Sequence, residues 1–188
     1  LWNLAPGAED PAWGGHTGEV RTAIFSPDER TLLTAGRDGT VRLWDAITGE
    51  ALAVLKEHTS CVNRISFAAD GDTFATGSCD KTIRLWSLRE RKLLTTLHGH
   101  SQEVDVIDFV DGGKTLVSLS RNTTASREIH MWDVATGAMS TDWPPPAAYD
   151  SLATAHLGRT ILTFADERVN VWKKTDAGWI SNAETYQL

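Results

Sequence analysis

The segment RTLLTAGRDGTVRLWD, residues 30–45, decides the fold, because three later segments repeat it. These are DTFATGSCDKTIRLWS at residues 72–87, KTLVSLSRNTTASREIHMWD at 114–133 and RTILTFADERVNVWK at 159–173. The first three copies begin at intervals of 42 residues. A repeat of this length indicates an array of similar structural units that stack on one another.

The same period governs where His, Phe and Trp occur. A His opens each of the first three units and a Phe follows nine residues later; these are His16, His58 and His100, with Phe25, Phe67 and Phe109. A Trp closes each unit, at Trp2, Trp44, Trp86, Trp132 and Trp172. Such regular placement favours packing inside the units over stacking on a cofactor, so we expect no cofactor.

Each unit is predicted to contain four short antiparallel strands. Alternating β-branched and aliphatic residues are typical of half-buried strands, and no segment has a sustained helical period. Turn-forming sequences separate the strands, at Pro27-Asp28-Glu29, Asp38-Gly39, Thr48-Gly49, Ala69-Asp70-Gly71, Asp111-Gly112-Gly113 and Thr136-Gly137. The sequence therefore predicts an all-β chain of four-stranded blades, which is the pattern of a β-propeller.

Two pairs of motifs resemble the WD-repeat family: Gly-His opening a unit (residues 15–16 and 99–100) and Trp-Asp closing one (44–45 and 132–133). The resemblance covers essentially the whole chain. It implies about four WD-type blades, at about 16–57, 58–99, 100–147 and 148–188, with residues 1–15 ending a preceding blade. The family typically has roughly seven blades. We therefore expect residues 1–188 to be part of a longer chain, or two copies to close a ring.

In this family a His, a Ser or Thr, an Asp and the Trp of one blade form a hydrogen-bonded tetrad. Their donors and acceptors can satisfy one another in series where water is scarce. The resemblance maps the first two tetrads to His16, Thr34, Asp38, Trp44 and to His58, Thr76, Asp80, Trp86.

The later tetrads are less regular. The third retains His100, Ser118 and Trp132, and its acidic position falls on Asn122 or Ser126, depending on the end from which it is counted. The fourth unit retains Thr163, Asp166 and Trp172, with Ala148 near the His position.

A register argument locates a candidate binding rim. If Phe67 opposes Thr73, Cys61 opposes Cys79, and the equivalent pairs in the neighbouring units are Glu19 with Arg37 and Glu103 with Arg121. These positions lie near the His and Asp turns, where the resemblance implies partner binding; cross-strand stabilisation is the alternative. The candidate rim residues are Glu19, Arg21, Arg37, Cys61, Asn63, Cys79, Glu103, Asp105 and Arg121. Cross-strand Cβ atoms lie about 4.5–5.5 Å apart, wider than a relaxed disulfide requires, so we expect reduced thiols.

Composition and the repeat exclude several functions. The net charge is −7, with 25 acidic and 18 basic residues, which argues against nucleic acid and anionic membranes as partners. No stretch approaches the roughly 20 apolar residues of a membrane span. Two cysteines are too few for a disulfide framework, so a cytoplasmic location is expected.

Metal and catalytic sites are not expected either. His98 and His100 have no third ligand nearby in sequence, so no metal site is predicted. The His, Thr and Asp set recurs at the repeat period, which favours a structural role over catalysis. Two function classes remain: a scaffold or recognition domain that binds proteins, and an accessory or sensor segment of a larger signalling enzyme whose catalytic part lies elsewhere.

Overall fold

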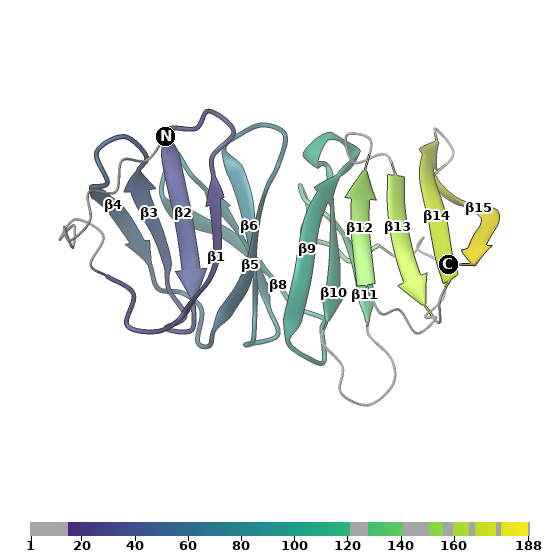
Figure 1. Ribbon diagram of the computed structural model, residues 1–188, viewed down its shortest axis with the longest axis horizontal. Helices are drawn as coiled ribbons and strands as arrows, with labels where there is room; N and C mark the ends of the chain where they lie inside the picture. The colour runs from purple at the N-terminus through teal and green to yellow at the C-terminus, as the bar shows by residue number, and fades with distance from the viewer. Residues whose placement is uncertain are drawn as a thin grey trace.

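The computed structural model describes residues 15–120, 128–140, 151–155, 160–165, 168–175 and 178–187. Within these ranges the regular structure is strand, apart from the short 3₁₀ turn η2 (Asp111–Gly113). The strands form four antiparallel sheets, each built from strands that are consecutive in the chain (Figure 1). The prediction of an all-β chain of blades is therefore confirmed. No helix in the described residues is long and apolar enough to cross a membrane.

The first two sheets have identical topology, with their strands in chain order. The first sheet contains β1 (Val20–Phe25), β2 (Thr31–Gly36), β3 (Val41–Asp45) and β4 (Ala51–Leu55). The second contains β5 (Val62–Phe67), β6 (Thr73–Ser78), β7 (Ile83–Ser87) and β8 (Lys92–Leu97).

The third and fourth sheets vary this plan. The third contains β9 (Val104–Val110), β10 (Thr115–Ser120) and β11 (Ile129–Asp133). At its outer edge a single bridge between Trp132 and Met139 stands where the other sheets have a fourth strand. The fourth sheet contains β12 (Ser151–Ala155), β13 (Thr160–Ala165), β14 (Arg168–Thr175) and β15 (Gly178–Gln187).

The first strands of successive sheets are neighbours. β1 contacts β5, β5 contacts β9, and β9 contacts β12. Figure 1 shows the sheets side by side, from the first at the left to the fourth at the right. Residues at the same register on successive first strands are therefore brought close together, although they lie 42 positions apart in sequence.

Three apolar clusters join consecutive sheets. The first includes Leu43 of β3 with Val62 and Trp86 of the second sheet. The second joins β7 to β9 and β11, and the third joins β10 and β11 to Ile161 of β13. Trp44, Trp86 and Trp132 are all fully buried, which agrees with a packing role for the repeated Trp. Burial of this kind contributes about 25 cal/mol per Å² of apolar surface and drives the stacking of blades.

The predicted register is wrong over most of the β5–β6 hairpin. Phe67 pairs with Phe74 rather than with Thr73, one residue out of step with the prediction. The register shifts between Val62 and Arg64, and β1/β2 and β9/β10 show equivalent shifts. A β-bulge inserts one extra residue into one strand, and a constant register cannot represent it. Beyond the bulge the pairing returns to the predicted register.

The prediction of reduced thiols is also wrong, because Cys61 and Cys79 form a disulfide. They lie just past the bulge, where the N–H of Cys79 donates to the carbonyl oxygen of Cys61 at 2.8 Å. Their Cα atoms are 5.2 Å apart, which is inside the range that a disulfide accepts. The predicted Cβ separation is the average for flat strands, whereas a bulge bends and twists the pair locally.

Candidate partner-binding rim and buried tetrads

The first sheet contains a chain of four hydrogen-bonded side chains. The indole N–H of Trp44 donates to Thr34 Oγ1 at 2.8 Å, and His16 Nε2 lies 2.8 Å from the same hydroxyl. His16 Nδ1 lies 2.9 Å from Asp38 Oδ2. Asp38 sits in the turn between β2 and β3 and also accepts the backbone N–H of Thr17. The chain therefore ties β2, β3 and the segment before β1 together.

The second sheet repeats this arrangement 42 residues later. The indole of Trp86 donates to Thr76 Oγ1 at 2.9 Å, and His58 Nε2 lies 2.7 Å from that hydroxyl. His58 Nδ1 lies 2.8 Å from Asp80 Oδ2. Thr76 and Trp86 are completely buried. The structure thus brings together the four residues that the family resemblance selects, in both sheets.

In these tetrads, burial and hydrogen bonding have opposite effects on the pKa of each Asp. Burial would raise the pKa of Asp38, but N–H groups of Thr40 and Thr17, with the Thr40 hydroxyl and His16, lower that pKa to about 2. The pKa of Asp80 is lowered in the same way, chiefly by hydrogen bonds from His58 and Thr82 that outweigh burial. Burial lowers the pKa of His58 despite its carboxylate neighbour. Near neutral pH the carboxylates are therefore charged and His58 is neutral.

In the third sheet a Glu takes the place of the Asp. His100 Nε2 lies 2.7 Å from Ser118 Oγ, to which the indole of Trp132 donates at 2.8 Å. Glu128 Oε2 accepts the N–H of Ser101 at 2.9 Å, as Asp38 accepts that of Thr17. Burial, followed by the neighbouring His130, lowers the pKa of His100 to about 4.

Sequence reasoning missed Glu128. The two residues that it named for the acidic position, Asn122 and Ser126, lie outside the described residues. Glu128 is four residues before the Trp, where the first two sheets have Thr40 and Thr82. A search for any carboxylate within the insertion would have found it.

Among the described residues, the fourth sheet retains one link of the tetrad. The indole N–H of Trp172 donates to Thr163 Oγ1 at 3.1 Å. Asp166 and Ala148 lie outside the described residues.

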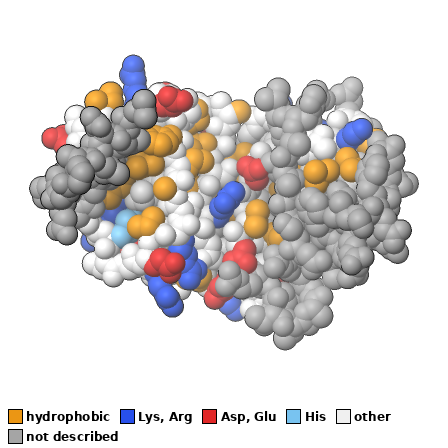
Figure 2. Space-filling model, in the orientation of Figure 1, with side chains coloured by type: hydrophobic (Ala, Val, Ile, Leu, Met, Phe, Trp, Pro, Cys, Tyr) orange, Lys and Arg blue, Asp and Glu red, His pale blue; other side chains and the backbone are white. Residues whose placement is uncertain are grey.

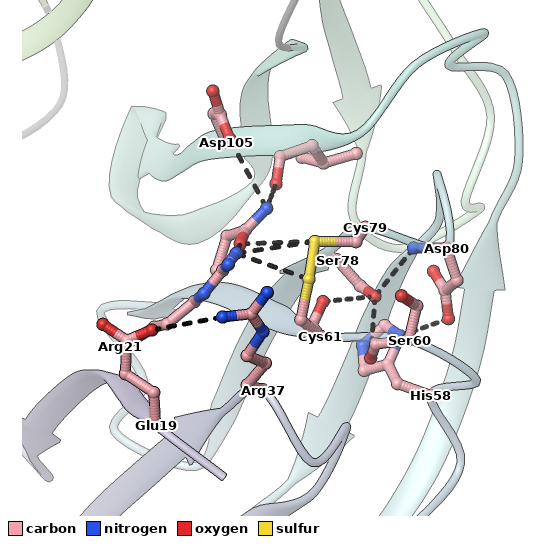
Figure 3. Close-up of a disulfide and its surroundings, with 12 residues drawn as sticks. Glu19, Arg21, Arg37, His58, Ser60, Cys61, Ser78, Cys79, Asp80 and Asp105 are labelled. Atoms are coloured by element: carbon pink, nitrogen blue, oxygen red, sulfur yellow. Dashed lines mark hydrogen bonds and ion pairs between the residues drawn. A yellow bond between two sulfur atoms is a disulfide. The ribbon is translucent and has the colours of Figure 1, made fainter.

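A row of polar side chains crosses the first strands of three sheets. Arg21 of β1 donates to Asn63 Oδ1 of β5. The Asn63 amide in turn donates to the carbonyl oxygen of Val104 at 2.9 Å and to Asp105 Oδ1 of β9 at 3.4 Å. The three candidate residues thus form a continuous row of contacts, each 42 positions from the next. Figure 3 labels the two ends of this row, Arg21 and Asp105, near the disulfide. We refer to Arg21, Asn63 and Asp105 as the polar row.

The disulfide and an exposed ion pair adjoin the polar row. Nη1 of Arg21 lies 3.3 Å from Cys61 Sγ and 3.6 Å from Cys79 Sγ. Arg37 Nη1 lies 4.0 Å from Glu19 Oε2, and about two thirds of each side chain is exposed. A pair this exposed contributes little to stability, so both charges remain available to a partner. Figure 3 shows Glu19, Arg21 and Arg37 gathered beside the disulfide.

The remaining candidates are less clearly placed. Glu103 is partly buried in the segment before β9. Arg121 lies outside the described residues, so its predicted pairing with Glu103 stays a prediction.

Comparison with known proteins agrees with this geometry. A model of the WD domain, G-beta repeat, matches residues 11–45, 49–87 and 91–133, which together make up more than half of the chain. The chain belongs to this family of WD-repeat β-propeller proteins, as the repeated motifs indicated.

Individual relatives match over short stretches. WD repeat-containing protein 38 of Mus musculus is 52% identical over 40 residues, covering 21% of this chain and 13% of the relative. Ribosome biogenesis protein erb1 of Neosartorya fischeri is 48% identical over 42 residues, 22% of this chain and 5% of the relative. Eukaryotic translation initiation factor 3 subunit I of Aspergillus niger is 40% identical over 53 residues, 28% of this chain and 16% of the relative. The matched region therefore spans only a small part of each relative.

Proposed function

We propose that this chain is a protein-interaction scaffold that binds its partners on the rim beside the polar row. The observation that carries the proposal is the contact of Arg21, Asn63 and Asp105 across three sheets, next to the exposed charges of Glu19 and Arg37. WD-repeat relatives named for ribosome biogenesis and translation initiation support a role within protein assemblies.

The polar row is suited to recognition because it is both held in place and polar. Hydrogen bonds between strands and the adjacent disulfide restrict Arg21 and Asn63, so little side-chain freedom is lost when a partner binds. Arg is enriched where interfaces concentrate their binding energy. Charges of both signs occur within the rim, which favours a partner surface of mixed charge over a purely acidic or basic one.

A pair of charge reversals tests this proposal. The variant Glu19→Arg/Arg37→Glu keeps an opposite-charge pair but reverses its direction. The control, Glu90→Lys/Lys92→Glu, reverses the ion pair between Glu90 in the β7–β8 turn and Lys92 at the start of β8, whose Oε2 and Nζ atoms lie 2.5 Å apart. That turn adjoins the β5–β6 turn, since the N–H of Leu88 donates to the carbonyl oxygen of Asp72, and both lie at the opposite rim.

Each immobilised full chain is incubated with an extract of its source cells, and the captured proteins are quantified. We expect the Glu19/Arg37 reversal to reduce specific capture at least about tenfold, the loss that about 1.4 kcal/mol of binding free energy produces. The control reversal is expected to retain it. Equal capture by both variants and the unmodified chain would overturn the choice of rim.

We also propose that the chain is not catalytic. The His and Asp residues that could suggest acid–base chemistry are engaged in the tetrads, where each His Nε2 faces a Thr or Ser hydroxyl. Measurable turnover that disappears on mutation of a rim residue in a folded chain would contradict this.

A cytoplasmic setting remains part of the proposal. The relatives named for ribosome biogenesis and translation initiation support an intracellular setting, whereas the Cys61–Cys79 disulfide opposes a reducing one, because disulfides are rare in reducing compartments. Quantifying free thiols in protein isolated under alkylating conditions tests the setting. Two alkylated cysteines per chain support a cytoplasmic setting, and a chain with no alkylated cysteine contradicts it.

We further propose that additional blades complete the ring, from a longer chain or a second copy. Val20 and Phe25 on β1 are 49% and 43% exposed, as expected of an apolar blade face that needs a neighbour. Light scattering of the purified 188-residue chain tests the second-copy form: a dimer supports it, and a monomer at high concentration excludes it.

A further inference from the structure

The third sheet has a cluster of ligand-type side chains that the first two sheets lack. Two residues before the Trp, the first two sheets carry Arg42 and Arg84, whereas the third carries His130. Its ring lies against that of His100, with the ring centroids 4.4 Å apart. The carboxylate of Glu128 faces both rings. The three side chains come from the segment before β9 and from the start of β11.

The distances place three ligand atoms around one point. Glu128 Oε2 lies 3.5 Å from His100 Nδ1 and 3.8 Å from His130 Nε2. All three atoms lie within 4.8 Å of one another. Two atoms bound tetrahedrally to one Zn²⁺ at its usual bond lengths are about 3.4 Å apart. Small side-chain movements would therefore bring the set to bonding geometry.

Two of these atoms are buried without a hydrogen-bond partner. Both His100 Nδ1 and His130 Nε2 are in this state, and the His100 side chain is only 1% exposed. In the first two sheets the equivalent Nδ1 atoms lie 2.9 and 2.8 Å from a carboxylate oxygen. Buried polar atoms in native proteins nearly always have a partner, so these two nitrogens are candidates to bind one shared ligand.

We propose that His100 Nδ1, His130 Nε2 and a Glu128 oxygen bind one Zn²⁺ ion. Imidazole nitrogen and carboxylate oxygen are both ligands that Zn²⁺ accepts, and two His with one Glu is a known donor combination for it. Three protein ligands leave a fourth position, which water fills. The ion replaces the direct His–carboxylate hydrogen bond of the regular tetrads and ties β11 to the segment before β9. The site does not depend on the proposed partner-binding rim.

Neighbouring groups orient the ligands. Ser118 Oγ accepts the indole N–H of Trp132 and lies 2.7 Å from His100 Nε2. If His100 carries its proton on Nε2, that N–H donates to Ser118, and the serine hydroxyl donates to the carbonyl oxygen of His130 at 3.4 Å. This arrangement leaves Nδ1 with a free lone pair directed at the site. Outer hydrogen bonds of this type are typical of His ligands.

The carboxylate is held as well. Glu128 accepts hydrogen bonds from the backbone N–H and the hydroxyl of Ser101. The sequence predicted no metal site because no third ligand stood near His98 and His100. The fold supplies the other ligands about 30 residues further along the chain, from Glu128 just before β11 and from His130 within it.

Zinc titration of the full chain tests the proposal, after dialysis against a chelator and in non-reducing buffer that keeps the disulfide closed. Calorimetry is expected to show one Zn²⁺ per chain, and Co²⁺ as a spectroscopic probe is expected to give the visible absorption of a tetrahedral site. Because Zn²⁺ binds the folded chain, it is also expected to raise the melting temperature.

The matched variant is His130→Arg, which introduces the arginine that the first two sheets have at this position, Arg42 and Arg84. It should fold, as judged by circular dichroism, and weaken Zn²⁺ binding at least about a hundredfold, since loss of an outer partner alone weakens it by up to that factor. Glu128→Gln serves as a second variant, and the exposed His98→Ala as a control that retains binding. Absence of Zn²⁺ binding in the unmodified chain, or equal binding by folded His130→Arg, would overturn the site.

Discussion

Cys61 and Cys79 face each other just beyond the β-bulge of the β5–β6 hairpin and are joined by a disulfide. The same positions in the first sheet hold Glu19 and Arg37, which form an ion pair instead. Equivalent residue pairs at the rim end of two successive hairpins are thus linked in different ways, by an ion pair in the first sheet and by a disulfide in the second. Arg21 contacts both sulfur atoms, so the disulfide also adjoins the polar row.

Breaking the disulfide is expected to destabilise the chain. The two cysteines are 18 residues apart, and closing a loop of this size stabilises the folded state by about 3 kcal/mol in the chain-entropy account. Urea denaturation with and without a reducing agent measures the difference. Cys61→Ser/Cys79→Ser should match the reduced chain, and a midpoint that does not respond to reductant would contradict the stabilising role.

Copying the first sheet into the second provides a further test. The variant Cys61→Glu/Cys79→Arg reproduces the pair Glu19 and Arg37, and we expect it to fold with an unchanged circular dichroism spectrum. Its stability should be close to that of the reduced chain, because an exposed ion pair adds only about 0–1 kcal/mol. Loss of the folded state in this variant alone, with Cys61→Ser/Cys79→Ser intact, would show that the two positions are not equivalent.

Removing a tetrad residue is expected to be costly. His58→Ala removes one of the two partners of the buried Thr76 hydroxyl, and Asp80→Ala leaves Nδ1 of His58 without its carboxylate. Each loss costs about 1–3 kcal/mol. Chemical denaturation measures the loss, and exposed His98→Ala is the matched control with no expected effect. Unchanged midpoints for both tetrad variants would refute the structural role of this hydrogen-bonded chain.

Acid is expected to weaken the fold, beginning near pH 6.5. Because the pKa of His58 is lowered from its ordinary value of 6.5, the unfolded chain takes up its proton first as pH falls. The stability that neutral His58 provides is complete above pH 6.5 and declines below it, by at most about 1.4 kcal/mol per pH unit for one proton.

A second loss is expected at lower pH, where Asp38 protonates in the unfolded chain near 3.8 but in the folded chain only at a pKa of about 2. Its contribution is present above pH 3.8 and declines as pH falls towards 2. Denaturation at a series of pH values measures both phases. The variant His58→Gln should show a smaller decline between pH 6.5 and 5 than the unmodified chain; an identical slope would contradict the assignment to His58.

The 42-residue period predicted the blades, and the family resemblance selected the residues of the first two tetrads, which recur at that period. Strand order and the burial of Trp44, Trp86 and Trp132 require only that each unit fold like its neighbours. The errors arise where local geometry interrupts that regularity. A bulge beside Arg64 shifts the register by one residue, and no residue type in the strand predicts this bulge.

The third sheet shows a different limit. Glu128 lies at the carboxylate position and His130 beside His100. The four extra residues between Ser118 and Trp132 break the 42-residue spacing, so counting along the chain does not assign these two residues. The contact of Arg21 with Asn63, by contrast, follows from equal spacing on adjacent first strands.

Site-specific photocrosslinking tests the central proposal, that partners bind on the rim beside the polar row. A photoreactive residue is placed at position 19 in one variant of the full chain and at position 90 in another, at opposite rims, and each is irradiated in an extract of its source cells. The proposal predicts discrete crosslinked products from position 19 and none from position 90. Products from position 90 alone, or the same products from both positions, would contradict it.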